Sequence, residues 1–154
     1  STLPNQFVKY SFQNNCIPIF QKYKLVKPEV AIRNHRFDFL LSNKRGKNFF
    51  LEVKSVTFVE DGIAKFPDAV TTRGMNHAKT LTDLVNEGEF AGILFVCQRS
   101  DATLFEPMWD RDPMFSNVLF NAYRIGVKVW CITLNVSETE ISFNKEIPVN
   151  FKKK

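Results

Sequence analysis

The stretch from residue 36 to residue 56 reads RFDFLLSNKRGKNFFLEVKSV, and this pattern predicts a β-hairpin. Residues 36–41 and 49–56 are strand-like runs rich in apolar side chains. The polar segment between them contains Gly46 and three cations, which is typical of a hairpin loop. The sequence therefore predicts two antiparallel strands in register about this loop, and the rest of the fold is built around them.

The hairpin carries a small group of charged residues. Side chains alternate along a strand, so Glu52 and Lys54 are expected on the same face. Counting outward from the loop places Asp38 opposite roughly Val53, next to Glu52. Two carboxylates and one lysine are therefore predicted to converge on one patch.

The chain on either side of the hairpin alternates between helical and strand patterns. In chain order, the predicted elements are a helix over 3–15, a strand over 30–32, the hairpin, a loop over 57–72, a helix over 73–87, a buried strand over 91–97, a helix from 112 to about 126, a buried strand over 127–134, and one or two edge strands within 140–151. The order α-β-β-β-α-β-α-β indicates the α/β class, with a mixed sheet flanked by helices.

Composition limits the kind of protein. With 154 residues, 44% hydrophobic and 24% charged, we expect a single domain over 1–151 and a basic tail over 152–154. Three separated cysteines without a CxxC pair, and no signal-peptide pattern, favour a reduced, cytoplasmic protein. No apolar run approaches about 18 residues, so no membrane partner is expected. No nucleotide-binding glycine motif is present either, and oligomeric state is not indicated. The chain lacks an initiator methionine, which suggests a fragment.

The charged patch suits metal chemistry. Two carboxylates at adjacent strand positions are hard ligands for a divalent cation such as Mg²⁺, or Mn²⁺ in its place. Such a cation activates water and neutralises phosphate charge, and a neighbouring lysine stabilises developing negative charge. Asp38, Glu52 and Lys54 form the pattern D-x(13)-E-x-K, the core of the PD-(D/E)XK nuclease motif, although Phe37 stands where the motif has proline. The competing interpretation is a set of cross-strand salt bridges.

Longer stretches resemble the sugar fermentation stimulation protein A family. The resemblance begins with Glu52-Val53-Lys54-Ser55-Val56-Thr57 and continues through Glu60-Asp61-Gly62 and the specific run from Phe66-Pro67-Asp68-Ala69-Val70 to Arg73-Gly74 and His77. Leu3-Pro4-Asn5, the run over 36–41, Phe95-Val96-Cys97-Gln98-Arg99 and Asp112-Pro113 agree in the same order. The match covers the whole chain.

This resemblance implies a PD-(D/E)XK, restriction-endonuclease-like core and an association with DNA. By position, it assigns Asp38 and Glu52 as metal carboxylates and Lys54 as the motif lysine, with the carbonyl of Val53 as a further metal ligand. Members of the family normally begin with a smaller OB-like domain, and this chain starts where the second domain would start. If that first domain carries much of the DNA affinity, binding by this chain alone is reduced.

Four further residues are candidates for substrate contact. Arg73 and His77 are spaced i, i+4 on the predicted helix and would share a face, where Arg73 could grip a phosphate. Asp68 precedes that helix and Gln98 ends a central strand. The competing interpretation for the helix pair is a solvated surface. His35 has the opposite parity to Asp38 and is interpreted as structural.

Two other features leave alternatives open. The loop Lys44-Arg45-Gly46-Lys47 is either a phosphate contact or a soluble hairpin tip. Met108 and Trp109 either stack on bases or close the core. From all of this we expect a divalent-metal-dependent nuclease that hydrolyses phosphodiester bonds in DNA. The alternative is a non-catalytic, sequence-independent DNA-binding or regulatory protein on a nuclease scaffold.

Overall fold

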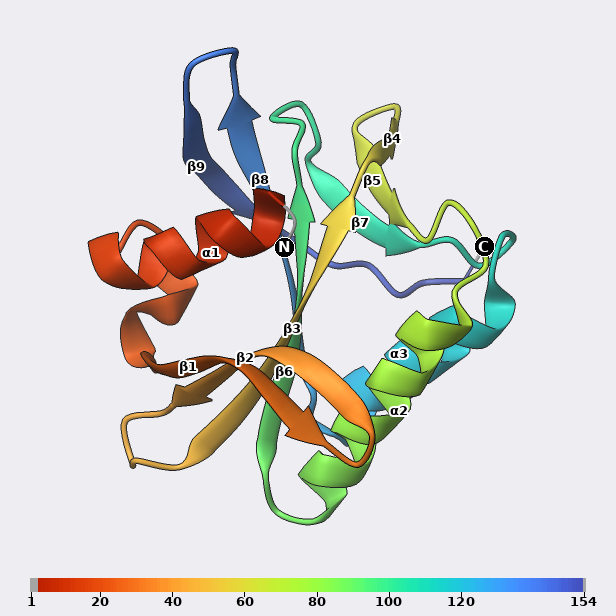
Figure 1. Ribbon diagram of the computed structural model, residues 1–154. Helices are drawn as coiled ribbons and strands as arrows, with labels where there is room; N and C mark the ends of the chain where they lie inside the picture. The colour runs from red at the N-terminus through yellow and green to blue at the C-terminus, as the bar shows by residue number, and fades with distance from the viewer. Residues whose placement is uncertain (1–2, 154) are drawn as a thin grey trace.

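A central six-stranded sheet organises the computed structural model, which describes residues 3–153 (Figure 1). Its strands lie in the order β1-β2-β3-β6-β8-β9. Their bounds are β1 Lys24–Ile32, β2 His35–Ser42, β3 Asn48–Val56, β6 Phe90–Cys97, β8 Lys128–Val136 and β9 Ile141–Ile147. The three central strands β3, β6 and β8 run parallel, and antiparallel strands flank them on both sides. The sheet is therefore mixed, as predicted.

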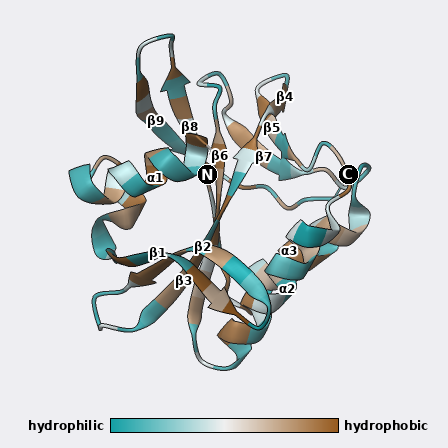
Figure 2. Ribbon diagram, viewed as in Figure 1, coloured by the Kyte–Doolittle hydropathy of each residue, from teal (hydrophilic) through white to brown (hydrophobic). Residues whose placement is uncertain are grey.

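Helices cover both faces of this sheet. On one side lie α1 (Leu3–Asn14) and the short 3₁₀ helix η1 (Pro18–Lys22), and on the other lie α2 (Thr72–Asn86) and α3 (Pro113–Ile125). Two separate clusters of buried apolar residues fill the spaces between the helices and the sheet. Hydrophilic residues lie along the outer surfaces of α1 and α2 (Figure 2). The predicted architecture, a mixed sheet flanked by helices, is confirmed.

One aspartate joins the starts of α2 and α3. Asp112 caps α3 by accepting a hydrogen bond from the backbone N–H of Phe115 at 3.0 Å, and it also accepts from the N–H of Thr71 at 2.9 Å. Thr71 in turn caps α2 by accepting from the N–H of Gly74. Capping groups of this kind satisfy N–H groups that a helix start leaves unpaired. The position of α2, which carries His77, is therefore fixed from the neighbouring helix.

The prediction of a loop over residues 57–72 is wrong. This segment contains β4 (Phe58–Glu60) and β5 (Ile63–Phe66), which form a separate three-stranded sheet with β7 (Leu104–Pro107). Asp61 and Gly62 make the turn between β4 and β5, both with positive φ. A two-residue Asp-Gly turn suits the twist of a hairpin, but strands of three and four residues carry too few side chains for an alternating pattern to be recognised.

No disulfide joins the cysteines in the described part of the chain. Cys97 and Cys131 are buried and free, and Cys16 is free and partly buried. Within residues 3–153, none of the helices has the length and apolar character needed to cross a bilayer.

Phe95 links the two sheets and gives a test of the packing. Its fully buried ring stacks on Phe105 with centroids 4.4 Å apart and contacts Phe66 at 5.2 Å. Phe95→Ala should therefore lower the free energy of unfolding by about 3–5 kcal/mol in urea titrations. Phe90→Ala on the same strand is the matched control, because Phe90 is 44% exposed, and it should cost well under half as much. Equal losses for both variants would contradict this packing.

Candidate functional site

The two strands of the predicted hairpin separate at Asp38. Their paired register runs from Ser42–Asn48 to Phe39–Leu51 and stops there. One residue further on, Oδ2 of Asp38 accepts a hydrogen bond from the backbone N–H of Val53 at 2.8 Å. The predicted proximity of Asp38 to Val53 is therefore observed, but the carboxylate makes the contact in place of a strand carbonyl.

Asp38 is also held from the first helix. Its Oδ1 accepts a hydrogen bond from Nδ2 of Asn5, on α1, at 2.8 Å. The carboxyl group of Glu52 lies beside Asp38 as well. Burial, followed by the hydrogen-bonding contact and negative charge of Glu52, raises the pKa of Asp38 to about 7, against the lowering effects of Val53 and Asn5. The site therefore holds two carboxyl groups side by side in partly buried surroundings that disfavour a second negative charge.

Glu52 is buried and ionised. Burial alone would raise its pKa, but the hydrogen bond from His77 and the charge of Lys54, with the contact to Asp38, lower the pKa to about 2. Oε2 of Glu52 lies 2.9 Å from Nζ of Lys54 and 2.6 Å from Nδ1 of His77. Oε1 is buried and has no hydrogen-bond partner within residues 3–153. A buried carboxylate oxygen without a donor is costly, so this atom marks a place for a ligand.

His77 reaches this cluster from α2. It is 3% exposed, and its Nδ1 also lies 3.2 Å from Nζ of Lys54. The rings of His35 and Phe37 pack against it, with centroids 5.4 and 5.5 Å away. The prediction that His35 lies on the face opposite the site is therefore wrong, because its ring contacts His77. Regular alternation breaks down at Asp38, because Phe37 packs with the α2 side of the sheet and Phe39 with the α1 side.

Within residues 3–153, the other predicted substrate residues form no hydrogen bond or ion pair with Asp38 or Glu52. Arg73 is exposed and makes no ion pair within residues 3–153, so it does not share the buried surroundings of His77. Asp68 is exposed, and its backbone carbonyl accepts a hydrogen bond from Arg111. Nε2 of Gln98 contacts Oγ of Ser55 at 3.3 Å, which places Gln98 beside the end of β3.

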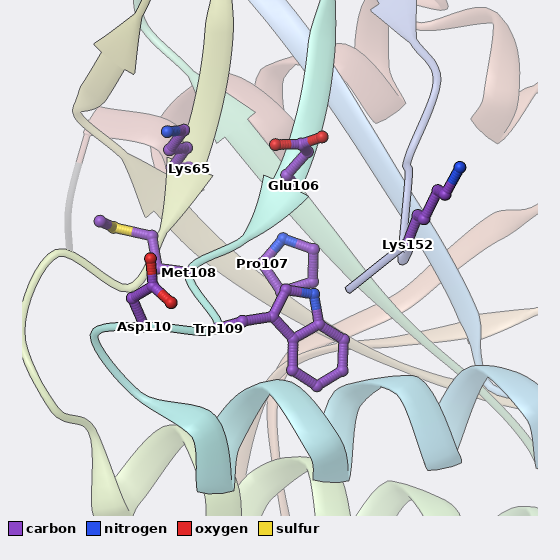
Figure 3. A pocket seen from close by; sticks show the side chains of 7 residues that line it. All are labelled: Lys65, Glu106, Pro107, Met108, Trp109, Asp110 and Lys152. Atoms are coloured by element: carbon purple, nitrogen blue, oxygen red, sulfur yellow. The ribbon is translucent and has the colours of Figure 1, made fainter. Parts of the chain in front are cut away.

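Met108 and Trp109 line a small cavity of about 80 Å³ away from the acidic pair (Figure 3). The indole Nε1 of Trp109 is buried without a partner in the described part of the chain, and its ring contacts Phe120 with centroids 6.5 Å apart. Nζ of Lys153 lies over the indole ring, 5.6 Å from its centroid. This arrangement favours the interpretation that Trp109 closes the edge of the core.

Sequence reasoning missed Asn5 as part of the site. Asn5 stands within the resemblance at Leu3-Pro4-Asn5, but no local sequence pattern connects it with the carboxylate of Asp38, which is 33 positions away. Among residues 3–153, no group of three or more His, Cys, Asp or Glu side chains is arranged to hold a metal. The available ligands are therefore the two carboxylates of Asp38 and Glu52, with backbone carbonyls such as that of Val53.

Comparison with known proteins shows the family of this chain. Residues 2–140 match the family described as "Sugar fermentation stimulation protein RE domain". Sugar fermentation stimulation protein homologues from Clostridium tetani and Desulforamulus reducens are 39% and 40% identical over 149 residues, which is 97% of this chain. The matches cover 65% and 62% of those two proteins, so the chain spans less than two thirds of their length.

A solved structure shows the same fold. SfsA of Pyrococcus furiosus, determined in complex with Ca²⁺, superposes with a TM-score of 0.89 and 26% sequence identity. The match covers 96% of this chain and 64% of that one. The chain therefore has the fold of this relative, with the predicted mixed sheet flanked by helices.

The raised pKa of Asp38 predicts how stability depends on pH. Between the pKa of an unfolded aspartate, near 4, and about 7, the folded protein retains a proton that the unfolded chain releases, so stability falls as pH rises. Asp38→Asn removes the ionisable group but keeps an acceptor for the N–H of Val53. The stability of this variant relative to wild type should rise by roughly 2–4 kcal/mol from pH 4 to pH 7 and then level off. Urea unfolding in EDTA at several pH values measures this, and a constant difference would contradict it.

Proposed function

The chain belongs to the sugar fermentation stimulation protein family, and from this membership and the buried acidic pair we propose a divalent-metal-dependent nuclease domain that hydrolyses phosphodiester bonds in DNA. The observation that carries the proposal is the buried Oε1 of Glu52, which has no hydrogen-bond partner within residues 3–153 and lies beside the partly buried carboxyl group of Asp38. Two neighbouring carboxyl groups with little solvent around them do not readily carry two negative charges at once, and a bound divalent cation would offset the second charge.

The residues present fit a hard divalent cation. Asp38, Glu52 and the backbone carbonyl of Val53 would hold Mg²⁺, or Mn²⁺, through oxygen atoms, and such ions keep several waters as further ligands. The solved relative from P. furiosus was determined in complex with Ca²⁺, another ion that prefers oxygen ligands, which supports this choice. When bound, a divalent cation neutralises phosphate charge and makes water a stronger nucleophile.

The protein groups around the pair have separate tasks in this proposal. The hydrogen bonds from Asn5 and from the N–H of Val53 fix the orientation of the Asp38 carboxylate. His77 and Lys54 fix Oε2 of Glu52 and leave Oε1 directed to the ligand. Lys54 donates to charge that develops on the scissile phosphate, since its ammonium has three donors.

The exposure of each remaining side chain decides which residues we propose as substrate contacts. Arg73 lies on the first turn of α2, and its guanidinium has no ion pair within residues 3–153, which suits bidentate binding of a phosphate. His77 is engaged by Glu52, so we propose it as a positioning residue for that carboxylate. Gln98 lies at the end of β6, next to the strand that carries Lys54, and Asp68 lies in the loop that precedes α2. We propose both as secondary contacts at the rim.

One observation favours the non-catalytic alternative. Glu52, Lys54 and His77 form a closed set of contacts, so the same cluster is also compatible with a purely structural ion pair. A protein of this kind would bind DNA through its surface cations without cutting it, and its affinity would fall with added salt. The two functions predict different behaviour of Lys54.

Lys54→Ala separates the two functions. It keeps both carboxylates but removes the donor beside the reacting phosphate, so Mg²⁺-dependent cleavage of DNA should fall about 10²–10³-fold. DNA affinity should change less than about twofold, because one cation among several is lost. Lys79→Ala is the matched control, since Lys79 is an exposed lysine on α2, and it should cleave like wild type.

Thermal unfolding of all three proteins checks that the fold persists. If wild type leaves DNA intact across Mg²⁺ and Mn²⁺ titrations, the protein is a binder and the nuclease proposal fails. If Lys54→Ala cleaves as fast as wild type, the role given to Lys54 is wrong.

A further inference from the structure

A basic trough lies at the end of the central sheet, where η1 meets the tip of the β2–β3 hairpin. Three hollows of about 290, 480 and 400 Å³ have Lys22 and Tyr23 as common lining residues. One opens between the hairpin tip and Phe90, one along the hairpin tip, and one toward the start of β8 at Lys128. Because they share these two residues, we treat them as one trough.

The trough is strongly positive. Its lining includes five cations, Lys22, Lys24, Lys44, Arg45 and Lys128, and one acidic residue, Glu146. None of these five cations forms an ion pair within residues 3–153, whereas the lysine of the acidic pair is fully engaged. Unpaired cations gathered along a concave surface attract an extended anion and release its counterions.

Aromatic rings lie along the same surface. Tyr23 is half-buried and rests against Phe49 and Trp130, with ring centroids 4.7 and 6.5 Å away, so its position is fixed. Phe90 lines the hollow beside the hairpin tip and is 44% exposed. An exposed phenylalanine next to lysines is the combination that binds single strands, where bases stack on rings and cations follow the backbone.

We propose that the basic trough binds single-stranded nucleic acid. The phosphates lie on Lys22, Lys44 and Arg45, and a base stacks on Phe90. A flexible single strand can follow three connected hollows, whereas a duplex, which is stiff over about 150 base pairs, would touch only the rim.

This surface is separate from the acidic pair. Ser42, at the hairpin tip, is four residues beyond Asp38 along β2, which corresponds to about 13 Å. Binding in the trough needs neither a divalent ion nor cleavage, so the inference goes beyond the proposed nuclease function and stands or falls independently of it. It also assigns a phosphate contact to the basic hairpin tip, for which the proposed chemistry at the acidic pair has no role.

The test compares two double variants of equal charge. Lys22→Gln with Arg45→Gln removes two trough cations, and Arg124→Gln with Lys145→Gln removes one exposed arginine and one exposed lysine elsewhere. Binding of a fluorescein-labelled dT20 strand is followed by anisotropy in EDTA with the whole chain. The trough variant should bind about tenfold more weakly, with a salt slope smaller by about 1.4, and the control should change less than about twofold.

Phe90→Ala tests the stacking without changing any charge. It should weaken binding of dT20 about fivefold or more and leave binding of a 20-base-pair duplex unchanged. Equal losses of affinity for dT20 in both double variants would show a general charge effect and overturn the proposal that the trough is the binding site. Equal effects of Phe90→Ala on strand and duplex, or no effect on either, would overturn the assignment to single strands. If the wild-type chain binds dT20 in the trough but cleaves no DNA in Mg²⁺ or Mn²⁺, that result counts against the nuclease proposal alone.

Discussion

The burial of the Glu52 carboxylate is the constraint on which the rest of the site depends. This group is 3% exposed and carries a charge, and an isolated charge in such surroundings would destabilise the fold by several kcal/mol. Lys54 from the same strand and His77 from α2 offset that charge at Oε2. Their contacts define where α2 docks on the sheet and which way Oε1 faces.

Asp38 adds a second constraint on the other side of the pair. Its two oxygens accept hydrogen bonds from α1 and β3, so a helix that covers one face of the sheet and a central strand meet at one carboxylate. The strand β2 must leave β3 at this point, because the Asp38 side chain takes the N–H of Val53 that a strand carbonyl would otherwise accept. The result is two acidic groups held close together at the place where the sheet opens, and the proposed metal site rests on this arrangement.

Much of this follows from local sequence patterns. The hairpin, the buried strands and the helices that flank them have strong periodicity, and each prediction depended on neighbours only a few residues apart. The convergence of Asp38, Glu52 and Lys54 was predicted from the alternation of side chains along the two strands and from the centre of the hairpin loop between them. The short strands of the second sheet were not predicted, because three or four residues carry almost no periodic signal. The Asp61-Gly62 turn is the local feature that indicates a hairpin there.

The rest depends on tertiary contacts that spacing does not show. Asn5 reaches Asp38 across 33 positions, and His35 comes to face His77 because β2 does not keep a regular alternation at Asp38. The i, i+4 spacing of Arg73 and His77 predicted a shared face, but the helix buries His77 and leaves Arg73 in solvent. Side-chain burial along a helix depends on what packs against each turn, and that information lies elsewhere in the chain.

The central claim is that Asp38 and Glu52 together hold a divalent cation. The most direct test is an anomalous difference map from crystals of this chain soaked in Mn²⁺. The account predicts one strong peak between the two carboxylates, about 2–2.5 Å from an oxygen of each and from the carbonyl of Val53. A map with no peak there, or with the ion bound elsewhere while both carboxylates are ordered, would contradict it.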